Sequence, residues 1–155
     1  MNTRIENVRR LFEPLGIDGL IIANGTNLRY LTGFEGGTGD GLVLIGRENA
    51  ALITDARYEE EYRERLDEGV QLLVTRDYWG VAMAAAKRFK IENLGFEDTL
   101  PFRDFDYLDE NFVGVDIAPV PALLEAIREV KDTDELAKLR RSAEVAVAAF
   151  NEMIP

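Results

Sequence analysis

Two short runs rich in β-forming residues, 42–45 and 50–54, are separated by only four residues. Parallel strands need a crossover connection of about a dozen residues or more, whereas antiparallel strands can be joined by a short hairpin loop. The four-residue link therefore predicts that these two runs form an antiparallel pair. Any sheet that also contains parallel strands must then be mixed.

Strand and helix patterns alternate along the rest of the chain. Short apolar runs bounded by Gly, Asn or Pro predict strands, and longer amphipathic or charged segments predict helices between them. These patterns indicate an α/β fold, a three-layer domain with a mixed β-sheet of about five or six strands and helices on both faces. The expected helices cover residues 3–15, 57–66, 79–89 and 102–110, and the further strands cover 20–23, 70–75, 94–97 and 113–120.

The composition excludes some classes of partner. The chain's 155 residues include 18 Lys or Arg and 29 Asp or Glu, which gives a formal charge of −11. This acidic excess argues against nucleic acid, because phosphate binding needs clustered cations. The first ten residues are charged, and no apolar run is long enough to span a bilayer, so we expect neither a signal peptide nor a membrane partner. The expected location is cytoplasmic.

The residue types available for catalysis are also limited, since the chain contains neither histidine nor cysteine. Ser-His and Cys-His pairs, thiolate nucleophiles and metal sites built on His or Cys are therefore impossible within it. The acid-rich stretch 97–116 lacks the spacing of a calcium loop, so we interpret it as a solvated helix face. The Gly-rich stretch 33–41 runs into a strand rather than a helix, so we interpret it as a surface loop and not as a phosphate loop. We expect no catalytic residue and no metal ligand in this chain.

The character of the sequence changes after residue 131. Asp132 and Glu135 have the spacing of a helix-capping box, and a helix is expected from there to about residue 151. Its apolar stripe needs a cover, which is either the chain's own sheet or a partner that follows. The stripe consists of Leu136, Leu139, Ala143, Ala146 and Phe150.

Three stretches, in order, resemble one family. Residues 27–34 (NLRYLTGF) resemble the N-x-x-Y-L-T-G-F signature of the N-terminal domain of creatinase and prolidase-type enzymes. Residues 54–58 (TDARY) are similar to the T-D-x-R-Y that follows a strand in that domain. Residues 131–150 resemble the junction at which that domain meets the catalytic domain.

The resemblance implies a ribonuclease H-like fold and a parent enzyme of the Xaa-Pro dipeptidase (prolidase) type, or a relative such as aminopeptidase P or creatinase. Residues 1–130 would form the non-catalytic N-terminal domain, and residues 131–155 would begin the linker helix to a missing C-terminal catalytic domain. In the family, that pita-bread domain holds two divalent metals, here Mn or Co, through Asp, Asp, His, Glu and Glu. The implied partners are this catalytic domain, a second copy in a homodimer, and the proline-containing peptide that the parent enzyme cleaves.

The motifs also supply candidate site residues. Asp55 and Arg57 lie at a strand-to-helix turn, where the carboxylate can accept amide hydrogen bonds and the guanidinium can pair with a nearby carboxylate. Tyr30 and Phe34 flank an expected turn at residues 32–33, and their rings can be core or can line a cleft. The residues that we consider for contacts in a cleft or at a dimer interface are Asn27, Tyr30, Phe34, Asp55, Arg57, Tyr58 and Trp79.

Two competing interpretations remain at this stage. The first is a free-standing α/β domain that binds a small molecule and packs its last helix on its own sheet. The second is an enzyme that works through its own carboxylates and Tyr, but no acid and base pair with opposed environments can be identified. The resemblance favours an N-terminal domain that supports dimerisation and shapes the active-site entrance of a longer enzyme.

Overall fold

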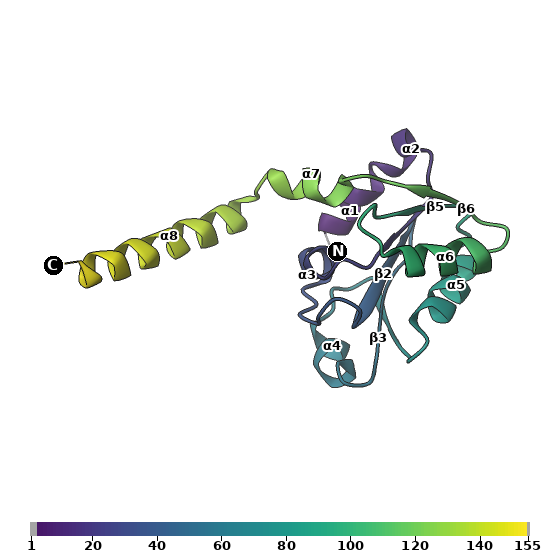
Figure 1. Cartoon of the computed structure of the whole chain (residues 1–155), viewed down its shortest axis with the longest axis horizontal. Helices are drawn as coiled ribbons and strands as arrows, with labels where there is room; N and C mark the ends of the chain where they lie inside the picture. The colour runs from purple at the N-terminus through teal and green to yellow at the C-terminus, as the bar shows by residue number, and fades with distance from the viewer. Residues whose placement is uncertain (1–2, 155) are drawn as a thin grey trace. The chain divides into compact units, whose positions relative to one another are not determined.

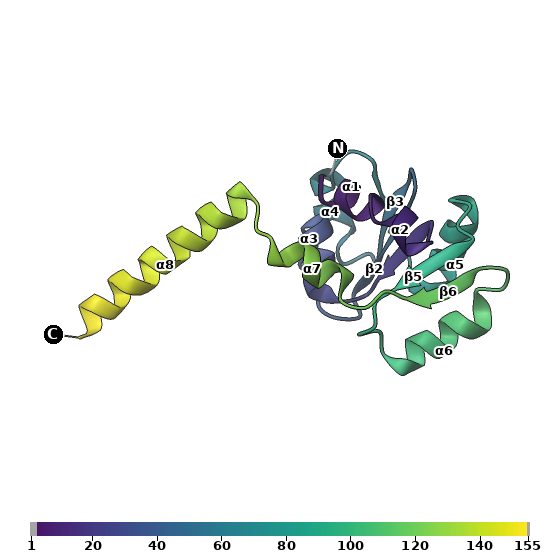
Figure 2. The same cartoon turned by 90° about the horizontal axis from the view of Figure 1, so that it is seen from above.

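The computed structural model describes residues 3–154, and within them six strands form one mixed sheet in the order β4-β3-β2-β1-β5-β6. β2 and β3 are the predicted hairpin, with Leu44 opposite Ala51, so the antiparallel prediction is confirmed. β2 is also antiparallel to β1, while β5 pairs with β1 and β6 with β5 in parallel (Figures 1 and 2). The strands are β1 (Gly19–Ile22), β2 (Gly41–Gly46), β3 (Ala50–Thr54), β4 (Val70–Val74), β5 (Asn93–Phe96) and β6 (Asp116–Pro119).

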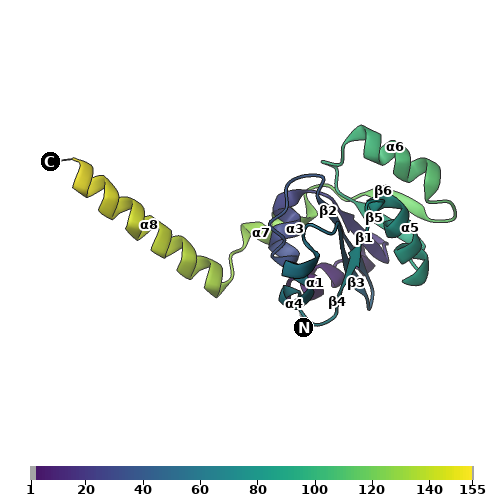
Figure 3. The same cartoon turned by 90° about the horizontal axis from the view of Figure 1, so that it is seen from below.

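Helices cover both faces of this sheet, which confirms the three-layer α/β prediction. Figure 3 shows α1, α3 and α4 on one face and α5 and α6 on the other. β3 and β4 are parallel and are connected through α4, as a crossover connection requires. The helices of this part of the chain are α1 (Thr3–Arg9), α2 (Phe12–Leu15), α3 (Gly25–Thr32), α4 (Glu59–Arg65), α5 (Tyr78–Arg88) and α6 (Phe102–Asn111).

The central strands are buried on both faces, as their unbroken apolar runs predict. Every residue of β1, β2 and β3 is buried. Ile21 and Leu44 belong to a buried cluster with Ala82 of α5 and Leu108 of α6. Since successive side chains of a strand point to opposite faces, Ile22 faces the layer that contains α1 and α3. The two apolar layers hold the sheet between the helices.

The predicted helix 3–15 is wrong in one respect, because the structure divides it into α1 and α2. Proline has no N–H to donate, and its ring clashes with the carbonyl four residues earlier. Pro14 lies within α2, so the carbonyl affected is that of Arg10. The helix is interrupted here, and the Leu11 N–H donates to the Val8 carbonyl, three residues earlier, and not to the carbonyl four residues earlier.

Two helices have no counterpart among the predicted elements. The first is α3, where the pattern suggested turns at both ends. Those turn residues are in fact helix caps: the Asn24 side chain accepts hydrogen bonds from the N–H groups of Thr26 and Asn27, and Gly33 ends the helix at φ +72°. The second is α7 (Leu123–Glu129), which follows Pro121.

The chain divides into two compact units, one ending at Ala122 and the other beginning at Leu123. The second unit contains α7 and α8 (Thr133–Met153). The capping box predicted at Asp132 and Glu135 is present, with reciprocal bonds of 2.8 and 3.0 Å. No residue of α8 is buried, and Leu139 is 54% exposed. Within residues 3–154, none of the helices combines the length and apolarity that crossing a bilayer demands.

Candidate functional site

The carboxyl ends of β1 and β5 meet at one edge of the sheet. The chain leaves β1 toward β2, and it leaves β5 toward β6 on the other side, so these neighbouring strands form a point where the connections diverge. Ligands of open α/β sheets bind outside the carboxyl ends of the strands at such a point. A binding site is therefore expected at this edge.

A buried carboxylate joins the two strand ends. Glu97, directly after β5, is only 7% exposed. Its Oε2 accepts hydrogen bonds from the N–H groups of Ala23 and Asn24 at 2.7 and 2.9 Å, and its Oε1 accepts one from the Asn27 side-chain amide at 2.6 Å. The prediction that stretch 97–116 is a solvated face is therefore wrong for Glu97. No sequence spacing indicates this role, because its partners lie about seventy residues earlier in the chain.

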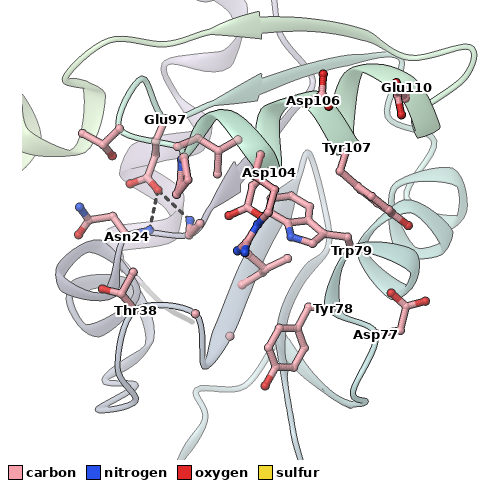
Figure 4. A pocket seen from close by; sticks show the side chains of 18 of the residues that line it. Asn24, Thr38, Asp77, Tyr78, Trp79, Glu97, Asp104, Asp106, Tyr107 and Glu110 are labelled. Atoms are coloured by element: carbon pink, nitrogen blue, oxygen red, sulfur yellow. Dashed lines mark hydrogen bonds and ion pairs between the residues drawn. The ribbon is translucent and has the colours of Figure 1, made fainter.

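A cleft of about 730 Å³ opens beside Glu97, and we call it the carboxyl-edge cleft. Its lining comes from the ends of β1 and β5, the start of β2, the start of α5, and α6 along most of its length. Figure 4 shows Trp79 in the middle of this pocket, with Tyr78 below it, Asp104 above it, and Glu97 to the left next to Asn24. The Trp79 and Tyr107 rings form a tilted pair with centroids 6.4 Å apart. The cleft therefore combines an aromatic wall with charged groups.

A second polar cluster lies around Arg57. Its guanidinium donates to the Asp55 carboxylate through Nε at 2.9 Å and through Nη2 at 2.7 Å, and Nη2 also contacts Asp40 Oδ1 at 2.7 Å. The Tyr58 hydroxyl donates to Asp40 at 2.9 Å, and the Tyr78 hydroxyl donates to Asp55 at 2.7 Å. We call these five residues the Arg57 cluster. They join the loop before β2 to the loop after β3 and to the start of α5.

The Arg57 cluster shifts the pKa values of its members. Arg57 is the main cause of a lowered pKa at both Asp40 and Asp55, and the tyrosine hydroxyls that donate to them add to the effect. The hydrogen bond to Asp40 raises the pKa of Tyr58. Burial, with the hydrogen bond to Asp55, raises the pKa of Tyr78 to about 12. All four groups therefore keep their present charge at neutral pH, which suits a structural network better than proton transfer.

These shifts predict how the stability depends on acid. A carboxyl group with a lower pKa in the folded state stabilises the fold above its unfolded pKa, near 4, and this contribution is lost as the pH falls through the folded value. Asp55→Asn should therefore lose less stability than the native chain when urea unfolding is compared between about pH 5 and about pH 2. Asp109→Asn, which removes an exposed carboxylate of α6, is the control. Identical acid dependence in Asp55→Asn and the native chain would contradict the prediction.

The aromatic residues of the two motifs pack together. Phe34 is fully buried, and its ring lies 4.9 Å from the Tyr58 ring in an edge-on contact and 5.1 Å from the Tyr62 ring. The Tyr62 hydroxyl accepts a hydrogen bond from the Glu35 N–H at 2.8 Å and donates one to the Gly33 carbonyl at 3.2 Å. The sequence analysis did not identify Tyr62, although its side chain is the largest of the fully buried ones among residues 3–154. The sequence does contain one indication that Tyr62 is buried beside Tyr58, because the two residues have helical spacing on an otherwise charged helix.

The structure distributes the predicted site residues over several places. Asp55, Arg57 and Tyr58 come together in the Arg57 cluster, where the predicted amide bond to Asp55 and the carboxylate pairing of Arg57 are present. Trp79 lines the carboxyl-edge cleft, and it also packs against the buried cluster below. Asn27 is buried beside Glu97, and Phe34 is core. Tyr30 lies apart from both sites, on α3, where the Arg4 guanidinium stacks 4.3 Å from its ring.

The side chains described do not fit a metal centre. Among residues 3–154, no three acidic side chains come together in a way that could hold a metal ion. The sequence contains no His or Cys to complete such a set. The two divalent metals that the family resemblance implies therefore have no ligand set among these residues.

Comparison with known proteins identifies the family. Residues 4–130 match the Creatinase/Prolidase N-terminal domain. The chain belongs to this family. The matched residues include the whole sheet, the Arg57 cluster and the carboxyl-edge cleft of this creatinase/prolidase N-terminal domain.

Related proteins extend the match beyond the domain. The chain is 32% identical to the uncharacterized peptidase YqhT of Bacillus subtilis, over 97% of this chain and 42% of the relative. It superposes on the structure of an Xaa-Pro dipeptidase from Bacillus anthracis with a TM-score of 0.86 and 30% identity, over 98% of this chain and 42% of that one. An Xaa-Pro aminopeptidase structure from Streptococcus pyogenes is similar with a TM-score of 0.73 and 27% identity, over 80% of this chain and 94% of that one. The chain thus spans less than half the length of the curated relatives that it matches.

Proposed function

We propose that this chain is the non-catalytic N-terminal domain of a metal-dependent Xaa-Pro dipeptidase of the prolidase type. In the full-length enzyme it supports dimerisation and shapes the entrance of the active site. Its partners are the C-terminal pita-bread catalytic domain, a second copy of the enzyme, and the proline-containing peptide that the enzyme cleaves. Residues 1–130 form the domain, and residues 131–155 begin the linker helix.

One observation carries this proposal: nearly the whole chain, including α8, matches the Bacillus anthracis dipeptidase, and more than half of that protein has no counterpart here. The lack of a metal-ligand set among residues 3–154 agrees with a catalytic centre in the part that would follow. The two divalent metals, Mn or Co, belong to that part in our proposal. They would supply the Lewis acid for peptide hydrolysis.

The motif residues have two proposed roles. Arg57 presents a side chain that is 64% exposed, and Tyr30, Tyr58 and Trp79 are half-buried, so these four can contact a second copy or border an entrance. Buried Asn27 and Phe34 act indirectly, by holding α3 and the loop after it in place. Asp55 acts in the same indirect way, since it orients the Arg57 guanidinium.

Two alternatives have support of their own. An aminopeptidase P or creatinase-like parent is supported by the similarity to the Streptococcus pyogenes aminopeptidase, whose chain is matched over 94% of its length. A free-standing domain that binds a small molecule is supported by the carboxyl-edge cleft. The two differ in whether a peptidase sequence follows the domain in the coding region.

The first test is catalytic. We expect the purified 155-residue chain to hydrolyse no Xaa-Pro dipeptide even with added Mn²⁺ or Co²⁺, because its sequence lacks His and Cys and its described residues, 3–154, form no carboxylate metal set. A protein that carries this chain together with a following catalytic segment should hydrolyse the same dipeptides in a metal-dependent way. The release of free proline measures the hydrolytic activity of both proteins. Metal-dependent turnover by a demonstrably pure 155-residue chain would overturn the proposal.

The second test concerns association. We expect the isolated chain to self-associate, because the exposed stripe of α8 presents apolar side chains that gain from burial. At physiological salt the screening length is about 8 Å, so the net charge of −11 opposes this only weakly. Sedimentation of the native chain and of the Leu139→Glu variant measures this self-association, with Glu13→Gln on α2 as the control. A strict monomer at high concentration, unchanged by Leu139→Glu, would contradict this expectation.

A further inference from the structure

The two edge strands of the sheet differ in composition. β6 forms one edge, and it carries the exposed Asp116 and Pro119, a charge and a residue without an N–H. Charged residues and proline in an edge strand hinder its pairing with another chain. β4 forms the other edge (Figure 3), and its five residues, Val70–Val74, include neither a charge nor a proline. Among residues 3–154 only β3 pairs with β4, so the outer edge of β4 is open to a further strand.

The backbone groups of β4 point alternately toward β3 and away from it. The Thr75 N–H donates to a carbonyl of β3. Since successive residues of a strand turn their N–H and C=O groups to opposite sides, the groups of Val70, Leu72 and Val74 point away from β3. The Val70 N–H already bonds to the Asp67 carbonyl, in the turn before the strand. The open edge therefore presents three carbonyls and two N–H groups, those of Leu72 and Val74.

A second copy of β4, antiparallel to the first and centred on Leu72, provides a partner for both N–H groups. Leu72 of each copy would exchange two hydrogen bonds with Leu72 of the other, as directly opposite residues do in an antiparallel ladder. The Val74 N–H of each copy would then donate to the Val70 carbonyl of the other. This arrangement has a twofold axis, so it closes as a dimer and leaves no open β4 edge.

The side chains of β4 also suit a second copy. Val70, Leu72 and Val74, together with Glu59 and Arg63 of α4, line a hollow of about 490 Å³. All three β4 side chains are at least partly exposed, and Val74 is 39% exposed. Directly opposite residues of an antiparallel pair share one face of the sheet, so these three side chains would meet those of the other copy. Pairing would therefore bury an apolar strip that a single copy leaves accessible to water.

The charges at the two ends of β4 favour the antiparallel direction. Glu68 lies in the turn before the strand and Arg76 in the bend after it, and both are exposed. Neither side chain has a hydrogen-bond or ion-pair partner among residues 3–154. Asp67 adds a second acid at the start, whereas Asp77, after Arg76, is engaged as the cap of α5. An antiparallel pair places the acidic start of each copy beside the arginine of the other, and a parallel pair would place like charges together.

We propose that β4 pairs with β4 of a second copy of this chain, so that one continuous sheet runs through both copies and Glu68 of each pairs with Arg76 of the other. The inference rests on the proposed function, because it supplies a surface for the dimerisation proposed there. That surface is separate from the apolar stripe of α8. Hydrolysis of Xaa-Pro dipeptides tests the class of the parent enzyme by itself, so a failure of the β4 pairing would leave that class unaffected.

Sedimentation and hydrogen exchange test the pairing in the Leu139→Glu variant, in which the α8 stripe carries a charge. This variant should still form a dimer as its concentration rises. The Leu72 and Val74 amides should become protected from exchange as the dimer forms, because they gain acceptors in the other copy. The Leu73 and Thr75 amides, which point toward β3, should be protected at every concentration. A monomer at every concentration, or a dimer in which the Leu72 and Val74 amides gain no protection, would overturn the proposal.

Charge reversal tests the direction of the pairing in the same Leu139→Glu background. Glu68→Arg and Arg76→Glu should each weaken the dimer about tenfold, because each turns two attractive pairs into repulsive ones. The variant with both changes restores opposite charges, so its dimer should dissociate within about twofold of the parent's constant. Glu13→Arg on α2, which is also exposed, changes the net charge as Glu68→Arg does and should leave the dimer as it is. A doubly reversed variant that dimerises as weakly as the single ones would overturn the proposal.

Discussion

Replacing Phe34 by alanine should lower the free energy of unfolding by about 3–5 kcal/mol, the usual cost of truncating a buried phenylalanine. Phe34 is completely buried, and its ring contacts the rings of Tyr58 and Tyr62. The loop around it is fitted closely, since a Cβ atom added at Gly36 would clash with the Phe34 ring. The loop therefore has little freedom to collapse into the space that the ring leaves.

Urea unfolding followed by circular dichroism measures this loss. Phe102→Ala is the matched control, because it removes the same side chain from a position that is 76% exposed, and it should change the stability by less than about 1 kcal/mol. A domain of this size is usually stable by about 5–15 kcal/mol, so the Phe34 variant should remain folded enough to measure. Similar losses in the two variants would show that the motif phenylalanine is not a core anchor.

Phe34 also shows what the sequence could not decide. Its motif and its neighbour Gly33 were recognisable in the sequence. Whether the Phe34 ring lies in the core or lines a cleft depended on its contact with Tyr62, which is 28 positions away in the sequence. Contacts of this kind follow from the tertiary fold and not from local spacing. In contrast, the hairpin of β2 and β3 followed from the length of its connection alone, and the structure confirms it.

The remaining differences have local physical causes. Pro14 divides the first helix because it lacks an N–H, a signal that was present in the sequence but outweighed by the apolar spacing. The caps of α3, Asn24 and Gly33, are residue types that turns and helix ends share, so pattern alone could not separate the two. The candidate site was predicted in part: the Asp55–Arg57 pairing was expected, whereas the role of Glu97 required the strand order.

Replacing Glu97 by alanine should lower the free energy of unfolding by about 3 kcal/mol, because each buried donor left without an acceptor costs about 1–3 kcal/mol. Three donors lose their acceptor: the N–H groups of Ala23 and Asn24 and the side-chain amide of Asn27. The expected cost lies at the lower end of the sum for three donors, because water from the adjoining carboxyl-edge cleft can hydrogen-bond to some of these donors. Glu97→Gln should cost less, as its carbonyl oxygen still accepts.

The loss of stability in Glu97→Ala should be concentrated around the hydrogen bonds that Glu97 makes. Native-state hydrogen exchange of this variant should therefore speed up more at Ala23 and Asn24, which link β1 to α3, than in the central strands. Glu110→Ala is the matched control, because it removes an exposed carboxylate from the same cleft. Asn27→Ala should be strongly non-additive with Glu97→Ala, since the two side chains share one hydrogen bond of 2.6 Å. Additive losses would mean that Glu97 stabilises the domain through other contacts, and the two strand ends would then be joined without it.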